Sequence, residues 1–90
     1  MIRFTVHFTG HVQGVGFRYT AHNTAMGFPI AGYVQNLPDG RVIVVAEGAE
    51  EQVQAYLDRL CEHLERFIRA KTIDRSPATG EFTGRFIIRH

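Results

Sequence analysis

The chain has one cysteine, no tryptophan and three prolines among its 90 residues. The single cysteine, Cys61, cannot form a disulfide within the chain or complete a cysteine-rich zinc site, so nothing indicates an oxidising compartment. Long apolar runs are also missing, and residues 1–9 alternate apolar with polar side chains, unlike the apolar core of a signal peptide. These absences predict a cytoplasmic protein with no membrane partner.

The sequence also has almost no excess of one sign of charge. Ten basic residues stand against nine acidic ones, which leaves a net charge of +1. Long-range attraction to nucleic acid is therefore weak, we expect no nucleic-acid partner, and any anion specificity must be local. A hydrophobic content of 44% is ordinary for a globular protein, and this length suits one core. We expect a single domain over residues 1–90 and a monomer.

Hydrophobic periodicity and turn residues predict strands and helices in alternation. An Asp39-Gly40 hairpin signal joins two of the strands, and residues 76–84 are rich in turn-forming types. Helices are expected from Phe17 to about Phe28, with Gly27 near the end, and around the apolar stripe from Val53 to Leu64. Strands are expected at 2–9, 30–36, 41–47, 67–74 and 85–89.

This order, β-α-β-β-α-β with a short extra terminal strand, predicts an α+β fold of the ferredoxin-like type. In that fold an antiparallel sheet is covered on one face by two helices. The same scaffold carries many unrelated activities, so the function has to be sought in particular segments.

The first such segment is Gly10-His11-Val12-Gln13-Gly14-Val15-Gly16-Phe17-Arg18, which leaves a strand and enters a helix. Glycines let backbone N–H groups turn inward, and a helix N-terminus adds unpaired N–H groups and positive dipole charge. Arg18 can grip two phosphate oxygens with its planar guanidinium. The spacing fits neither a Rossmann fingerprint nor a Walker loop. Taken alone, the segment is better explained as a glycine loop that only reverses the chain.

The second segment places Asn36 at the end of a strand, before the hairpin. An asparagine there can simply stabilise the turn through its side chain. A functional interpretation of Asn36 therefore needs a partner elsewhere in the sequence.

Together, Gly-x-Val-Gln-Gly-Val-Gly-Phe-Arg and, eighteen residues after its arginine, the asparagine of Gly-Tyr-Val-x-Asn-x-x-Asp-Gly strongly resemble the acylphosphatase family. The resemblance covers residues 4–57 closely and returns weakly at Thr79-Gly80-Glu81 and the closing strand. It implies that Asn36 orients the attacking water and that Arg18 is catalytic and binds phosphate. The phosphate-binding residues implied are Gln13, Gly14, Val15, Gly16, Phe17 and Arg18.

One departure from the family pattern lies between the second helix and the fourth strand. The family usually has a glycine-proline break there, whereas this chain runs from Glu62 to Phe67 without one. Either a longer helix or a different turn is expected, and the start of the fourth strand stays open.

The residues favour a reaction without a metal, a cofactor or a covalent intermediate. A thiol phosphatase would need a cysteine where this chain has Val12, and Cys61 lies on the apolar stripe of a helix. His11 is the one histidine near the loop, and scattered histidines without paired carboxylates do not suggest a metal site. We expect hydrolysis of a small acyl phosphate by direct attack of water, with inorganic phosphate as product and inhibitor.

Three other interpretations remain. The chain could be a non-catalytic phosphate-binding module, like the acylphosphatase-type domain at the front of larger carbamoyl-transfer proteins. An RNA-recognition domain shares the strand order but needs exposed aromatics on the first and third strands, whereas Phe4 and Phe8 belong to the core face and 42–47 has no aromatic. A purely structural role is disfavoured by the joint spacing of Arg18 and Asn36.

Overall fold

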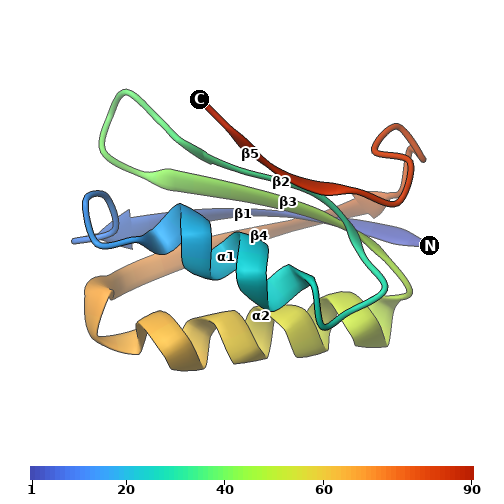
Figure 1. Cartoon of the computed structure of the whole chain (residues 1–90), viewed down its shortest axis with the longest axis horizontal. Helices are drawn as coiled ribbons and strands as arrows, with labels where there is room; N and C mark the ends of the chain where they lie inside the picture. The colour runs from blue at the N-terminus through green and yellow to red at the C-terminus, as the bar shows by residue number, and fades with distance from the viewer.

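The computed structural model describes residues 1–90 and contains one five-stranded sheet with two helices on one face (Figure 1). The predicted α+β, ferredoxin-like arrangement is confirmed. A 3-10 turn, η1 (Glu65–Phe67), follows the second helix. The elements are β1 (Ile2–Gly10), α1 (Phe17–Ala25), β2 (Ala31–Asn36), β3 (Val42–Gly48), α2 (Glu50–Leu64), β4 (Ile68–Pro77) and β5 (Phe86–Arg89).

The strand order is β4-β1-β3-β2-β5. The three pairs β4-β1, β1-β3 and β3-β2 are antiparallel. The last strand differs from the expected antiparallel pattern, because β5 pairs parallel with β2, with Tyr33 opposite Ile87. After β4 the chain crosses one end of the sheet and returns along the far edge (Figure 1). β5 therefore runs toward the same end of the sheet as Asn36.

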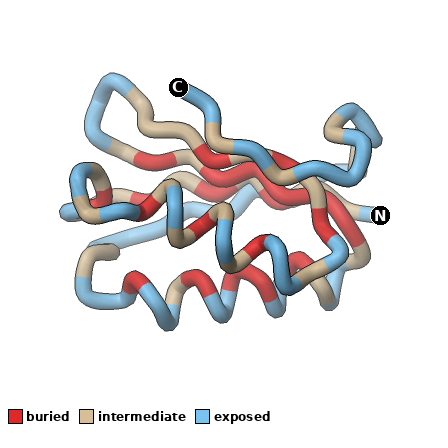
Figure 2. Tube along the Cα trace, in the orientation of Figure 1, coloured by how far each residue is buried: buried red, intermediate tan, exposed pale blue.

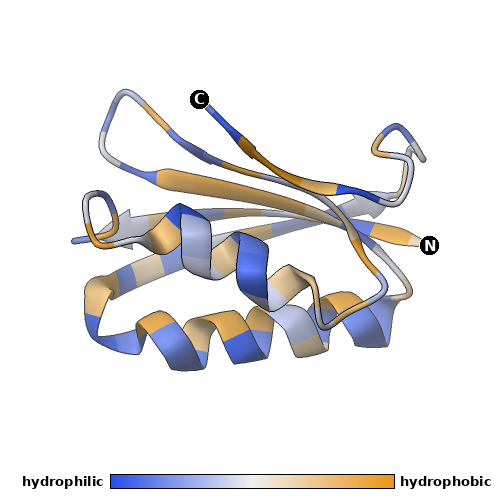
Figure 3. Cartoon of the chain, in the orientation of Figure 1, coloured by the Kyte–Doolittle hydropathy of each residue, from blue (hydrophilic) through white to orange (hydrophobic).

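The core lies between the sheet and the helices. Alternate residues of β1, namely Phe4, Val6 and Phe8, are at most 2% exposed, and α2 buries its predicted stripe against them. Figure 2 shows buried positions along the central strands and on the inner sides of both helices, and Figure 3 shows apolar residues at the inner side of α2. The Tyr56 hydroxyl donates a hydrogen bond to the Ala21 carbonyl at 2.9 Å, which links the two helices.

The fourth strand differs most from the prediction. It runs to Pro77, although the turn-type residues from 76 onward predicted a loop, because β1 pairs with it along its whole length, from Gly10 opposite Ile68 to Ile2 opposite Pro77. The junction without a glycine-proline break is the 3-10 turn η1. It packs so closely against β1 that a Cβ on Gly10 would lie 2.5 Å from the Phe67 carbonyl oxygen, so only glycine fits there.

Candidate active site

The glycine loop enters α1 with the geometry of an anion-binding turn. Gly14 and Gly16 have φ angles of 78° and 80°, which L-residues with a side chain rarely adopt. Gly16 is also the N-cap of α1, so no side chain caps the helix, and its first turn contains no acidic residue. The N–H groups of the first turn and the positive end of the helix dipole therefore face a position without local negative charge.

The loop and the end of β2 line one small pocket. Its volume is about 170 Å³, and it contains both Arg18 and Asn36, which are eighteen residues apart in the sequence. The pocket is lined by Val12, Gly14, Gly16, Phe17, Arg18, Tyr19 and Asn36. A site of this size suits a phosphoryl group with one or two waters, since each water occupies about 30 Å³ in the liquid.

Asn36 brings an unpaired acceptor to this pocket. It is the last residue of β2 and pairs in register with Val42 of β3, so the sheet fixes its backbone. Its Oδ1 atom is buried and has no hydrogen-bond partner within the protein. Buried acceptors are nearly always paired, so an unpaired one in a residue that lines a pocket marks Asn36 as a candidate binding residue.

Gln13 connects the loop to the hairpin that follows Asn36. Its side-chain amide donates hydrogen bonds to the carbonyl oxygens of Leu37 at 2.8 Å and of Arg41 at 2.9 Å. Two such bonds, one to each side of the hairpin, fix the loop relative to the end of β2. The geometry therefore gives the Gln13 side chain a positioning role between the two segments.

Arg18 keeps its positive charge available at the pocket. None of the four ion pairs in the structure involves it. Its Nη1 atom lies 3.2 Å from Nδ1 of His90, just beyond the end of β5. Because the guanidinium has five donors, one contact to an imidazole leaves the others free for a phosphate.

The structure thus brings together five of the seven residues predicted for the site. Gly14, Gly16, Phe17, Arg18 and Asn36 line the pocket, whereas Gln13 bonds to the hairpin and Val15 packs against the core. The sequence reasoning missed three neighbours, and the first of them, Val12, lines the pocket as a fully buried residue of the loop. Tyr19 follows Arg18 directly and could have been suspected from its exposure on a short helix, while His90 gave no signal because the pairing of β5 was not predictable.

The other candidate groups lie outside the pocket. Burial raises the pKa of the Cys61 thiol on α2, which disfavours a reactive thiolate despite the nearby Lys71. The His11 ring is exposed and lies 6.5 Å from the Phe67 ring. No cluster of three or more side chains suited to holding a metal ion occurs, and neither helix has the length and apolar character needed to cross a bilayer.

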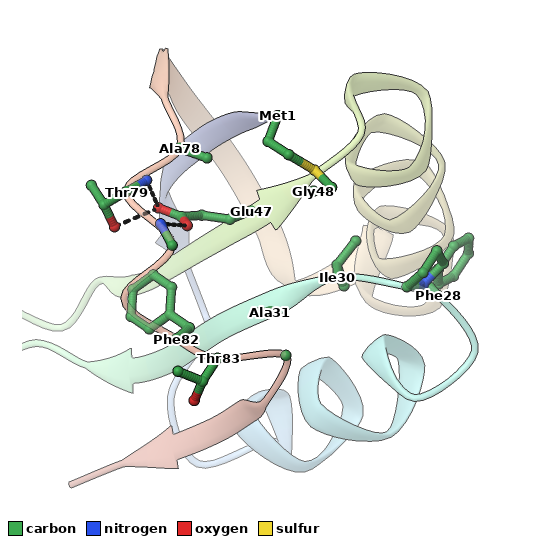
Figure 4. Close-up of a pocket in the computed structure, with 13 residues that line it drawn as sticks. Met1, Phe28, Ile30, Ala31, Glu47, Gly48, Ala78, Thr79, Phe82 and Thr83 are labelled. Carbon is green, nitrogen blue, oxygen red and sulfur yellow. Dashed lines mark hydrogen bonds between the residues drawn. The ribbon is translucent and has the colours of Figure 1, made fainter.

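The largest cavity, about 690 Å³, lies at the opposite end of the sheet, beneath the crossing segment 78–84 (Figure 4). The carboxylate of Glu47 there accepts hydrogen bonds from the amides of Thr79 and Gly80 and from Arg3. With its oxygens paired, Glu47 ties the crossing segment to β3. We therefore place the chemistry in the smaller pocket, where the charged and unpaired groups converge.

The Glu47 contacts predict an acid-sensitive fold. Burial alone would raise the pKa of Glu47, but hydrogen bonds from the Thr79 amide, Arg3 and the Gly80 amide hold this pKa below its ordinary value. Hydrogen bonds from Arg3 and Thr79 likewise lower the pKa of Glu81. Stability from such carboxylates is complete above the ordinary pKa of about 4.3 and is lost as the pH falls through the lower folded-state values. Melting temperatures should therefore be constant from about pH 7 to 5 and fall below about pH 4.

The variant Glu47→Gln should be about 2 kcal/mol less stable at neutral pH, because the hydrogen bonds from Arg3 and the two amides lose their charged acceptor. Its stability should also fall less steeply in acid. Glu62→Gln, on the exposed face of α2, is the matched control. An unchanged acid profile in Glu47→Gln would show that Glu47 does not fasten the crossing segment.

Comparison with known proteins points to one family. The family model described as acylphosphatase matches residues 4–88. An acylphosphatase of Corynebacterium efficiens is 47% identical over 72 residues, covering 80% of this chain and 73% of that protein. The crystal structure of an acylphosphatase from Bacillus subtilis superposes over the full length of both chains with a TM-score of 0.87 and 29% identity.

A larger protein contains the same fold. HypF of T. kodakarensis matches all of this chain with a TM-score of 0.84 and 30% identity, although the match spans only 12% of HypF. The family model covers nearly the whole chain, and the Corynebacterium protein matches most of it at high identity. The chain therefore belongs to the acylphosphatase family.

Proposed function

We propose that this chain hydrolyses the carboxyl-phosphate bond of small acyl phosphates, giving a carboxylate and inorganic phosphate by direct attack of water. The observation that carries the proposal is the shared pocket, in which an arginine without an ion-pair partner and an asparagine with an unpaired amide oxygen meet at an uncapped helix N-terminus. These groups match the two needs of the reaction, which are to bind a phosphoryl group and to hold a water.

In the proposed mechanism, the loop amides from Gln13 to Phe17 and the Arg18 guanidinium bind the phosphoryl oxygens. Charge that develops on these oxygens is stabilised by donors that are already oriented. The side-chain amide of Asn36 hydrogen-bonds to the attacking water and holds it in line with the P–O bond that breaks. The water oxygen bonds to phosphorus as the P–O bond to the acyl group breaks, and the electron pair leaves with the carboxylate.

The proton of the water needs no protein base. A carboxylate is a good leaving group, so neither a strong general acid nor a strong base is required. No side chain of Asp, Glu, His or Lys lines the pocket, and a phosphoryl oxygen of the substrate takes up the proton. No metal or cofactor takes part in this scheme.

The direct test measures phosphate release from acetyl phosphate, with a phosphate monoester as control. We expect turnover of acetyl phosphate that persists after treatment with a chelator, little turnover of the monoester, and competitive inhibition by inorganic phosphate. Failure to release phosphate from any of several acyl phosphates would contradict the proposal.

A second candidate is a non-catalytic phosphate-binding module. It is favoured by the likeness to HypF, in which the matched region is a small part of a larger chain. Such a module would bind phosphate at the Arg18 pocket without turnover, so calorimetric binding of phosphate together with absent hydrolysis would select it.

The direct-attack mechanism predicts that Cys61→Ser and His11→Gln keep most of their activity, within about threefold of the unmodified chain, since neither side chain lines the pocket. Rapid quenching with a labelled substrate should trap no phosphorylated protein. A stoichiometric burst of phosphoenzyme, or inactivity of folded His11→Gln, would instead indicate a covalent intermediate.

We further propose that the chain acts as a monomeric single domain over residues 1–90 in the cytoplasm. The balanced net charge and the lone, half-buried cysteine support this view. Sedimentation analysis at working concentration tests the monomer, and fractionation of the source cells tests the location.

A further inference from the structure

We infer that Tyr19 is the contact for the acyl group and that it gives the site a preference for acyl phosphates with an apolar, above all aromatic, acyl part. The inference rests on the proposed function and extends it to the substrate class. Nothing in the phosphate-binding loop or Asn36 distinguishes one acyl group from another, because both act at the phosphorus.

Tyr19 occupies an unusual position for an aromatic side chain. It is 70% exposed, and none of the aromatic pairs of the structure includes it. Helical spacing explains the exposure, since α1 turns Phe17, Ala21 and Ala25 toward the core and Tyr19 away from it. Five large apolar side chains are exposed in the protein, and of these only Tyr19 lines the candidate site.

The dimensions of the pocket place the acyl group outside it. A volume of about 170 Å³ is smaller than the roughly 300–1,000 Å³ of pockets that enclose a drug-sized ligand. With the phosphoryl group at the loop amides and Arg18, the rest of the substrate must extend past the opening. Tyr19 belongs to both regions, since it lines the pocket and is mostly exposed to solvent.

The chemistry of the tyrosine ring then selects the kind of acyl group. A phenol ring offers a flat apolar face that binds other rings by offset or edge-to-face packing, and such pairs contribute about 0.5–1.5 kcal/mol beyond burial. It offers no charge to recognise a second acidic or basic group. An aromatic or bulky alkyl acyl phosphate therefore gains a contact that acetyl phosphate, with one methyl group, cannot make.

The test compares benzoyl phosphate with acetyl phosphate in four proteins: the unmodified chain, Tyr19→Ala, Tyr19→Phe and Met26→Ala. We expect Tyr19→Ala to lower kcat/KM for benzoyl phosphate about fivefold, the ratio given by one aromatic contact of about 1 kcal/mol. Its kcat/KM for acetyl phosphate should fall clearly less, so that the ratio of the two kcat/KM values falls toward that of a site without the ring. Tyr19→Phe keeps the ring and should keep the preference of the unmodified chain for benzoyl phosphate over acetyl phosphate. Met26→Ala removes another exposed apolar side chain, at the far end of α1 and outside the pocket, and should also have no effect.

A binding measurement separates this inference from the proposed function. Phenylphosphonate and methylphosphonate carry the same acidic group and cannot be hydrolysed as acyl phosphates, so calorimetry with both probes the contact without turnover. We expect tighter binding of phenylphosphonate by the unmodified chain and equal binding by Tyr19→Ala. Absent turnover of acetyl phosphate would refute the proposed function alone. An equal loss for both substrates, or a phenyl preference that survives in Tyr19→Ala, would overturn the role of Tyr19.

Discussion

Arg18→Lys should lower kcat/KM for acetyl phosphate about 100-fold although the charge is kept. The guanidinium presents two parallel N–H donors to two phosphate oxygens, whereas an ammonium acts as a point charge on a flexible stem. Loss of one preorganised contact at the transition state typically raises the activation free energy by about 3 kcal/mol, which corresponds to that ratio. Arg18 lies in the first turn of α1, so the shorter reach of lysine also moves the charge away from the loop amides.

Steady-state kinetics with acetyl phosphate, together with competitive inhibition by phosphate, measures the effect. Arg59→Lys, on the exposed side of α2, makes the same chemical change away from the pocket and should leave both quantities unaltered. If Arg18→Lys turned over substrate at a near-normal rate while folded, Arg18 would have no part in the site.

Asn36→Ala should lower turnover by roughly 10² while phosphate still binds with similar affinity. The loop and Arg18 remain in this variant, so ground-state binding of the phosphoryl group is kept. The attacking water loses the side-chain amide that orients it, and positioning of this kind affects kcat more than binding.

The unpaired Oδ1 atom of Asn36 helps to separate a catalytic role from a purely structural one. If Asn36 served only to stabilise the hairpin, its removal would lower stability by about 1 kcal/mol and leave turnover of the folded protein intact. Because Oδ1 makes no hydrogen bond within the protein, we expect the melting temperature of Asn36→Ala to change little. Asn23→Ala, at an exposed position of α1, is the matched control for the loss of an asparagine side chain. Normal turnover with lowered stability would refute the catalytic role.

The pattern of side chains predicted most of the fold because each element obeys its local periodicity. The alternation from Ile2 to Phe8 was sufficient to predict β1, and the stripe from Val53 to Leu64 was sufficient to predict α2, since one face of each element is buried. The extension of β4 to Pro77 was not predictable, because it depends on pairing with β1 and not on the turn-type residues themselves. The parallel pairing of β5 depends on how the chain crosses the sheet, which short-range patterns do not encode.

The site was predictable to the extent that its residues lie in contiguous motifs. Arg18 and Asn36 stand out in sequence, and the structure supplies the pocket that they share. The contacts of the Gln13 side chain were not predictable, because its partners are carbonyl oxygens of a hairpin that is distant in sequence. Backbone carbonyls carry no signature in a sequence, so contacts of this kind become visible only in three dimensions.

The pairing of β1 on both of its edges bears on how fast the chain folds. Both neighbours of β1 come from later parts of the sequence, and its pairing with β4 joins Ile2 to Pro77, almost the two ends of the chain. The entropy of closing such large loops must be lost before the strand pairs can form, which slows folding when most contacts are long-range. We therefore expect folding on the order of milliseconds to seconds, and not the microseconds typical of helical bundles of this size. During that time β1 has no complete set of partners, and in a chain emerging from the ribosome the backbone along one edge of β1 stays unpaired until β4 has been made.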